Sequence, residues 1–195
     1  MTKTSQQPHG ASRKPKHGSP WRWVGFAVAP LALAILVAVS TVTETEDATV
    51  EQAIPFELTA TDGQTISLED SLADGDALLY FSMGVGCDGC FAQIPELEAG
   101  MAERGIDLLP IMVDPAQIVA SEAARFGIEG SILIDPGAQV SAAYGMVGIY
   151  GHSDRPSRSF ALVRQSGEIA WVRHYAEMFV PAASLLDELD AALEL

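Results

Sequence analysis

The two cysteines of this 195-residue chain form a single C-x-x-C motif, Cys87-Asp88-Gly89-Cys90. Two thiols at this spacing can close a small disulfide ring and open it again, which is the chemistry of thiol–disulfide exchange. A cysteine at the start of a helix meets the positive end of the helix dipole and unpaired N–H groups, and both favour the thiolate. The motif therefore predicts redox chemistry if a strand and a helix hold it in that position.

The residues around the motif predict such a strand and such a helix. Ala77–Phe81 is a short, continuous apolar run, which is typical of a strand in the centre of a sheet. Cys90–Arg104 predicts a helix that Pro95 kinks, and Asp114 is the expected N-cap of a later helix. Further strands are predicted at 56–60, 65–68, 106–113, 132–135, 160–163 and 169–175, and further helices over 115–126, 140–144 and 181–195. This order predicts an α/β fold with a mixed central sheet flanked by helices.

Other uses of two cysteines compete with redox chemistry. Zinc would need two further soft ligands, and only His152 and His174 could supply them in the body of the chain. A soft-metal carrier could add Met83 to the cysteines. A purely structural disulfide would close so short a loop that it would remove little entropy from the unfolded chain. We therefore favour the redox interpretation, and we expect neither a metal nor a cofactor.

The charges divide the chain into a basic start and an acidic body. The first 22 residues hold five of the 11 Lys and Arg residues and no Asp or Glu. From Glu44 onward, 26 acidic residues stand against 6 arginines, which gives a net charge of −20. Because such a body repels phosphate backbones, we expect no nucleic-acid partner.

An apolar stretch, residues 23–42, separates the two parts and has the length of a membrane-spanning helix. The positive-inside rule then places the basic start in the cytoplasm and the acidic body outside the cell membrane. A cleavable signal sequence is the alternative, because Ala38-Val39-Ser40 could be a cleavage site, and it would export the body as well. We therefore expect a disordered cytoplasmic tail at 1–22, a single-pass anchor at 23–42, a linker at 43–53 and one extracytoplasmic domain at 54–195.

Several stretches of that domain resemble the thioredoxin superfamily, in particular its redoxin (AhpC/TSA) and TlpA/ResA-like branch of membrane-anchored thiol–disulfide oxidoreductases. The resemblance runs in family order through Phe56–Leu68, Leu78–Leu97, Leu109–Asp114, Ile134–Gly145 and Phe160–Ile169. It implies a thioredoxin-like fold in which Cys87 attacks a substrate disulfide and Cys90 resolves the mixed disulfide. It also implies extracytoplasmic protein disulfides or thiols as substrates and a membrane reductant donor as a partner.

The chain departs from that family pattern at three positions near the motif. Family members place a cis-proline three residues before the Phe of a late strand; here Ser157 holds that position and Pro156 precedes it, so we expect Pro156 to be the loop proline that faces the disulfide. The buried carboxylate of thioredoxins has no counterpart in the strand before the motif. Asp88 lies beside Cys87 and should favour its neutral thiol, which predicts a reducing or isomerising enzyme rather than a strong oxidant.

The resemblance also supports a peroxidase as an alternative function. Peroxiredoxins carry a Thr three residues before the peroxidatic cysteine and an Arg that polarises the peroxide. By spacing, Cys90 would be peroxidatic, Cys87 stands in place of the Thr, and Arg158 or Arg155 would be the Arg. A membrane-tethered module that binds a soft metal or a partner without catalysis is the second alternative.

Overall fold

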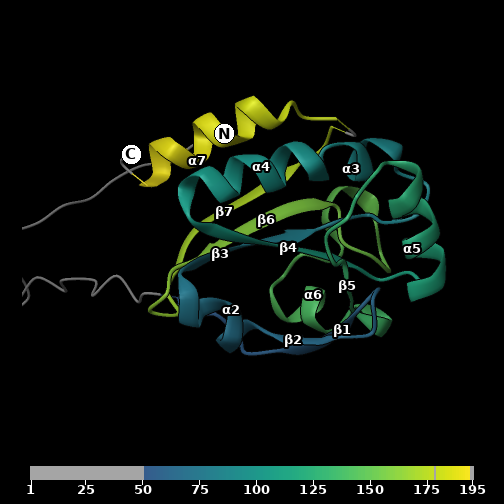
Figure 1. Ribbon diagram of the computed structural model, residues 1–195, viewed down its shortest axis with the longest axis horizontal. Helices are drawn as coiled ribbons and strands as arrows, with labels where there is room; N and C mark the ends of the chain where they lie inside the picture. Colours follow the sequence, from purple (N-terminus) through teal and green to yellow (C-terminus); the bar gives the residue numbers. More distant parts are fainter. Residues whose placement is uncertain (1–50, 178, 194–195) are drawn as a thin grey trace, which may run out of the picture. The chain divides into compact units, whose positions relative to one another are not determined.

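A mixed sheet of seven strands forms the centre of the structure, a computed structural model that describes residues 51–177 and 179–193 (Figure 1). The strands lie in the order β2 (Thr65–Ser67), β1 (Glu57–Ala60), β5 (Leu133–Ile134), β4 (Ile106–Met112), β3 (Asp76–Phe81), β6 (Arg158–Val163) and β7 (Ile169–Tyr175). β3 lies between β4, to which it is parallel, and β6, to which it is antiparallel. All of β3 after Asp76 is buried, which explains its unbroken apolar run.

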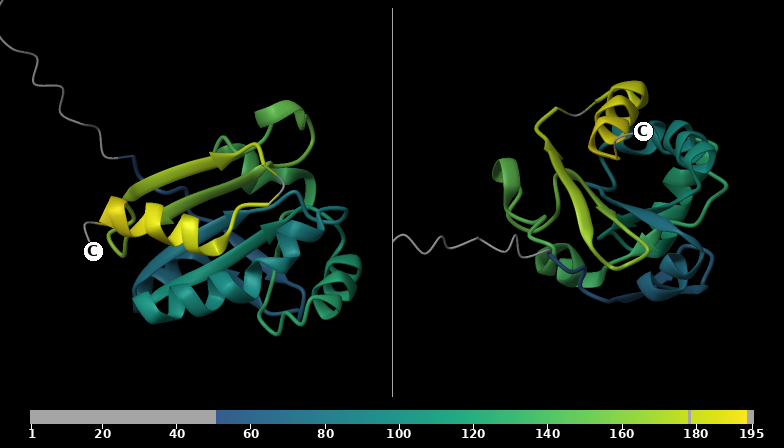
Figure 2. Two further views of the ribbon diagram at one scale, coloured as in Figure 1. Left: turned by 90° about the horizontal axis from the view of Figure 1, so that it is seen from above. Right: turned by 90° about the vertical axis from the view of Figure 1, so that its left-hand side faces the viewer.

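Helices cover both faces of this sheet (Figures 1 and 2). One face carries α3 (Asp88–Ala92), α4 (Ile94–Arg104), α5 (Ala116–Arg125) and α7 (Ala182–Leu193), and the other carries α2 (Leu68–Asp74) and α6 (Gln139–Ala143). Because side chains alternate along a strand, Leu78 and Tyr80 enter the first core, whereas Leu79 and Phe81 enter the second. The predicted α/β architecture, a mixed sheet flanked by helices, is confirmed.

The predicted N-terminal segments lie outside the described residues. This holds for the tail at 1–22, the anchor at 23–42 and all but the last three residues of the linker at 43–53. In the ranges that the structure describes, no helix is both long enough and apolar enough to cross a bilayer. The transmembrane helix therefore stays a prediction.

Three local expectations differ from the structure. The strand predicted over 65–68 ends at Ser67, whose hydroxyl accepts a hydrogen bond from the N–H of Asp70 (3.1 Å) and caps α2. The helix predicted over 90–104 is two helices, because α4 starts afresh at Ile94 with Pro95 in its first turn, where a missing N–H leaves no hydrogen bond unmade. The N-cap of α5 is Pro115, not Asp114. The carboxylate of Asp114 instead binds the loop that leads to the cysteines.

Candidate functional site

Cys87 and Cys90 form a disulfide where the chain passes from β3 into α3. Cys87 is the N-cap residue of α3, and the N–H of Cys90 donates to its carbonyl oxygen (2.9 Å), so one helical turn brings the two sulfurs together. Both cysteines are buried, with exposed fractions of 1% for Cys87 and 0% for Cys90. The predicted strand–motif–helix arrangement is therefore present.

Two charged side chains, Asp114 after β4 and Arg155 before β6, hold the loop between β3 and Cys87 in place. The N–H of Val85 donates to Asp114 Oδ2 (2.8 Å), and Gly84 has a φ of +77° beside the same carboxylate. Arg155 Nη1 donates to the carbonyl oxygen of Met83 (3.1 Å) and lies 3.7 Å from Asp114 Oδ1. These contacts fix the position of the backbone immediately before the first cysteine.

Arg158 places its guanidinium against the disulfide. It is the first residue of β6, beside the end of β3, and only 1% of it is exposed. Its Nη2 lies 3.7 Å from Cys90 Sγ and 4.0 Å from Cys87 Sγ. A buried positive charge at this distance stabilises a thiolate formed on either cysteine when the disulfide is reduced.

Tyr80 supports the same cluster from β3. Its hydroxyl donates to the carbonyl oxygen of Cys90 (3.2 Å), and its ring stacks on Phe160 with the centroids 4.6 Å apart. Burial raises the pKa of Tyr80 to about 12, although the charge of Arg158 opposes this shift. Tyr80 is therefore a neutral hydrogen-bond donor at physiological pH.

A cavity of about 120 Å³ reaches the disulfide at Cys90. Figure 2 shows the turn η3 (Ile149–Gly151) projecting near the end of β7, and side chains from both regions join the cavity wall. Tyr150 in this turn has a φ of +52° and is 56% exposed. The cavity is lined by Met83, Cys90, Tyr150, His152, Ser157, Arg158, Tyr175, Ala176 and Glu177.

Comparison with known proteins decides the family. The family model described as Redoxin matches residues 47–179, which is more than half of the chain. The chain belongs to the redoxin family. The thioredoxin-superfamily membership and the oxidoreductase class expected from the sequence are thereby confirmed.

The proteins similar to this redoxin include some named for thiol–disulfide exchange and some named as peroxidases. It is 29% identical over 126 residues to the thiol-disulfide oxidoreductase ResA of Halalkalibacterium halodurans, a match that covers 63% of this chain and 66%, just under two thirds, of that protein. The peroxidoxin BcpB of Mycobacterium tuberculosis superposes with a TM-score of 0.61 at 23% identity, over 75% of this chain and 96% of that one. A putative protein disulfide isomerase of Bacteroides thetaiotaomicron superposes with a TM-score of 0.55 at 22% identity, over 75% and 90% of the two chains. These two structural matches show the thioredoxin-like fold.

Of the predicted site residues other than the cysteines, only Arg158 lies against the sulfurs. Arg158 lies at the sulfurs, whereas Arg155 contacts the loop before Cys87. Pro156 is buried in an isolated bridge with Val147, and all described peptide bonds, including the one before it, are trans. The residues that follow Pro156, Ser157 and Arg158, line the cavity instead.

Sequence reasoning identified Cys90 and Arg158 in the cavity wall as functional, but not the side chains that complete the wall. Tyr150, Tyr175 and Glu177 come from segments without a motif, and His152 is named in the sequence analysis only as a possible zinc ligand. Gly148 and Gly151, both with positive φ, mark an irregular turn around Tyr150. Two glycines three residues apart were the available sequence signal, although they did not indicate that the turn lies beside Cys90.

Proposed function

We propose that this redoxin is an extracytoplasmic thiol–disulfide oxidoreductase whose redox centre is the pair Cys87 and Cys90. The observation that carries the proposal is that both sulfurs lie within 4.0 Å of the buried guanidinium of Arg158. The pair can form a disulfide, and a fixed charge is present to stabilise the thiolate that exchange requires. The redoxin family and the similarity to a thiol-disulfide oxidoreductase support the same chemistry.

In the proposed reaction, the Cys87 thiolate attacks one sulfur of a substrate disulfide. A mixed disulfide forms, and the first substrate thiolate leaves and takes up a proton. Cys90 then loses its proton and attacks Cys87 Sγ, which releases the second substrate thiol and leaves the enzyme disulfide. The substrate gains two electrons and two protons, so a dithiol donor must reduce the enzyme before the next cycle.

The charges of Asp88 and Arg158 have opposite effects on the stability of a Cys87 thiolate, and so on whether the enzyme oxidises or reduces its substrates. Asp88 is exposed, so water screens its effect on Cys87, whereas Arg158 is buried beside both sulfurs. Stabilising the thiolate stabilises the reduced form and makes the couple more oxidising. Of the two directions that the sequence predicts, reducing and isomerising, the position of Arg158 favours isomerisation. Pro156, which lies in a buried bridge with Val147 directly before Ser157 and Arg158, is proposed as the loop proline that faces the disulfide.

The same proposal includes a membrane location. The basic tail at 1–22 would lie in the cytoplasm, residues 23–42 would span the membrane, and the domain from 54 to 195 would meet protein disulfides or thiols and a membrane reductant donor outside. The charge asymmetry and the apolar stretch support this arrangement. Reporter fusions at residue 20 and at residue 195 test it, because the proposal requires opposite sides of the membrane for the two positions.

Insulin reduction tests the exchange activity. The full-length chain is compared with Cys87→Ser and Cys90→Ser, with dithiothreitol as the donor. We expect the wild type to accelerate insulin precipitation, Cys87→Ser to be inactive, and Cys90→Ser to accumulate a mixed disulfide with substrate through Cys87. A wild type without activity above the dithiothreitol background would refute the proposal.

A thiol peroxidase with Cys90 as the peroxidatic residue is the second candidate. The cavity favours it, because its wall includes Cys90 and Arg158 but not Cys87, and its size suits a small peroxide better than a folded protein. In that reaction the Cys90 thiolate attacks the peroxide, and water or an alcohol leaves. The Cys87 thiol then attacks the sulfenic acid on Cys90, which forms the disulfide and releases water. The test is the consumption of hydrogen peroxide in the first turnover of the reduced protein. The peroxidase is selected if the Cys87→Ser variant keeps this activity and the Cys90→Ser variant loses it.

A further inference from the structure

The edge of β4 that faces β5 is paired over only a small part of its length. On its other side, β4 pairs with β3 from Ile106 to Ile111. β5 has two residues, and its register reaches only Ile111 and Met112 of β4. The first half of β4 therefore has one strand neighbour among the described residues.

Two hydrogen bonds show which backbone groups of β4 face this open edge. The N–H of Ser82, next to β3, donates to the carbonyl oxygen of Ile111 (3.0 Å), whereas the N–H of Asp135, next to β5, donates to that of Met112 (2.8 Å). Successive residues of a strand direct their backbone groups to opposite edges, so Pro110 and Leu108 face the same side as Met112. The N–H and carbonyl of Leu108 thus face the part of this edge that β5 leaves uncovered.

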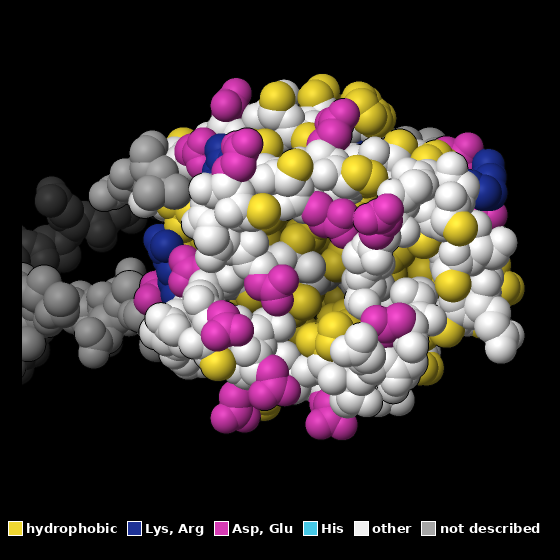
Figure 3. Space-filling model, viewed as in Figure 1, with side chains coloured by type: hydrophobic (Ala, Val, Ile, Leu, Met, Phe, Trp, Pro, Cys, Tyr) yellow, Lys and Arg dark blue, Asp and Glu magenta, His cyan; other side chains and the backbone are white. Residues whose placement is uncertain are grey.

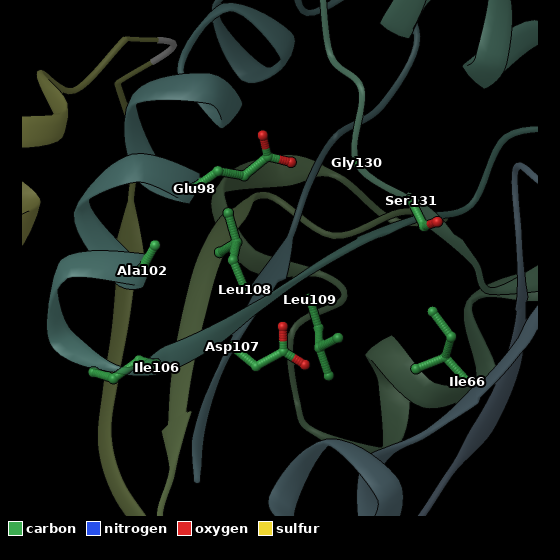
Figure 4. Close-up of a pocket in the computed structure, with 9 residues that line it drawn as sticks. All are labelled: Ile66, Glu98, Ala102, Ile106, Asp107, Leu108, Leu109, Gly130 and Ser131. Atoms are coloured by element: carbon green, nitrogen blue, oxygen red, sulfur yellow. The ribbon is translucent and has the colours of Figure 1, made fainter. Parts of the chain in front are cut away.

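A hollow of about 340 Å³ lies along this edge (Figure 4). Leu108 and Leu109 of β4 form one side. In Figure 4, Glu98 of α4 lies above Leu108, Ala102 of α4 lies beside it, and Ile66 of β2 faces the two leucines across the space. The hollow is lined by Ile66, Glu98, Ala102, Ile106, Asp107, Leu108, Leu109, Gly130 and Ser131. It therefore offers apolar side chains next to unpaired backbone groups, which are the two features that an added strand uses.

The hollow is also acidic. Glu98 and Asp107 line it, Glu129 lies next to Gly130 in the chain, and none of the three makes an ion pair within the described residues. Partial burial and the charge of Glu129 raise the pKa of Glu98. Figure 3 shows acidic side chains around an apolar hollow on this face, whereas the arginine side chains lie toward its margins. A positive charge brought into the hollow would therefore be stabilised.

We propose that the open edge of β4 binds an extended, basic segment of a partner protein, which adds to the sheet beside Leu108. The N–H and carbonyl groups of Leu108 would pair with the backbone of the segment, and its lysine or arginine side chains would meet Glu98 and Asp107. A second copy of this chain fits less well, because its net charge from Glu44 onward is −20 and it contains no lysine there. The site lies at the beginning of β4, whereas the disulfide follows the end of the parallel strand β3, so both can be occupied together.

Peptide binding to the full-length chain tests the proposal. The probe is a blocked, fluorescent peptide of alternating valine pairs and lysine pairs, which places lysines on both faces of a strand of about six residues. We expect saturable binding by fluorescence anisotropy, no binding of the peptide in which glutamate replaces lysine, and none of the fully N-methylated peptide, which keeps the charge but loses the backbone donors. Equal binding of the N-methylated peptide would overturn the proposal, since attraction to the acidic surface alone would then explain the affinity.

Matched variants locate the site. The double variant Glu98→Gln, Asp107→Asn should weaken binding about 10-fold or more, because it removes two negative charges that line the hollow. Glu57→Gln with Glu69→Gln removes the same net charge from exposed positions outside the hollow and should change the affinity less than about 2-fold. Equal losses in the two pairs would contradict the assignment to this hollow.

A backbone variant tests strand addition itself. Leu108→Pro removes the N–H that faces the hollow, while Leu108→Val keeps it with a smaller side chain. β4 already accommodates Pro110 on the same edge, so we expect both variants to fold and only Leu108→Pro to lose binding. Binding that appears only after residues 1–22 are deleted would overturn the proposal in favour of the chain's own basic tail as the occupant.

Discussion

Arg158 is the residue through which the structure most directly influences the chemistry of the disulfide. Because its guanidinium lies 3.7 and 4.0 Å from the two sulfurs, it stabilises the reduced, thiolate-bearing form. We expect Arg158→Met to make the couple more reducing, with a reduction potential lower by about 30 to 60 mV, measured by equilibration with glutathione. The exposed Arg125→Met on α5 is the control for the lost charge, and an equal shift there would show that Arg158 has no specific effect.

Gly84 is the residue on which the loop before Cys87 depends. A Cβ there would lie 2.1 Å from Asp114 Oδ2, whereas a Cβ on Gly86, which also has positive φ, would meet nothing within 4 Å. We expect Gly86→Ala to lower the free energy of unfolding by about 1 kcal/mol through backbone strain alone, and Gly84→Ala by about 2 to 4 kcal/mol. Denaturant unfolding of the two variants checks this, and equal losses would remove the role given to Asp114.

At the scale of elements, close approach of α7 to α4 holds the C-terminal helix on the sheet. A Cβ on Gly100 of α4 would lie 2.6 Å from Leu186 Cδ1, and Arg104 Nε donates to Asp190 Oδ1 (2.6 Å) one turn further along. We expect Gly100→Ala to destabilise the fold by about 1 to 3 kcal/mol, although alanine is the better helix former. In a Leu186→Ala background the same change should be neutral or stabilising, and a double-mutant cycle by denaturant unfolding measures the difference.

The elements that sequence reasoning predicted are those with a strong local signal. The apolar run of β3 and the leucines of α7 each identify their element without knowledge of the neighbours. Asp114 shows the limit, because the local pattern makes it an N-cap, whereas its partner, the N–H of Val85, is 29 positions away. The site divides in the same way: the cysteines were evident from their spacing and Arg158 from a family resemblance, but the approach of Tyr150 and Glu177 to Cys90 depends on tertiary packing.

For the whole molecule, the large acidic excess makes stability depend on pH. Glu98 is an example, because burial and the charge of Glu129 raise its pKa in the folded chain. The folded state therefore binds this proton more tightly than the unfolded state, so the contribution is fully present below the ordinary glutamate pKa of about 4.3 and is lost as pH rises through the raised value. We expect Glu98→Gln to gain stability relative to the wild type as pH rises from about 4 to 7, measured by thermal unfolding at each pH. A constant difference across that range would contradict this assignment.

Pro110 also affects how the molecule behaves at high concentration. An exposed strand edge can template the strand of a neighbouring molecule, and a proline on that edge withholds a donor that such pairing needs. With Pro110 and the charge of Asp107, the first half of β4 can pair with one short peptide segment but is unsuited to repeated strand pairing between molecules, which leads to aggregation. We expect Pro110→Val, which restores the donor, to cause concentration-dependent aggregation in light scattering, while Val172→Thr on the edge strand β7 should remain monodisperse. The proline that limits pairing at β4 thus helps to keep a β-rich protein in solution.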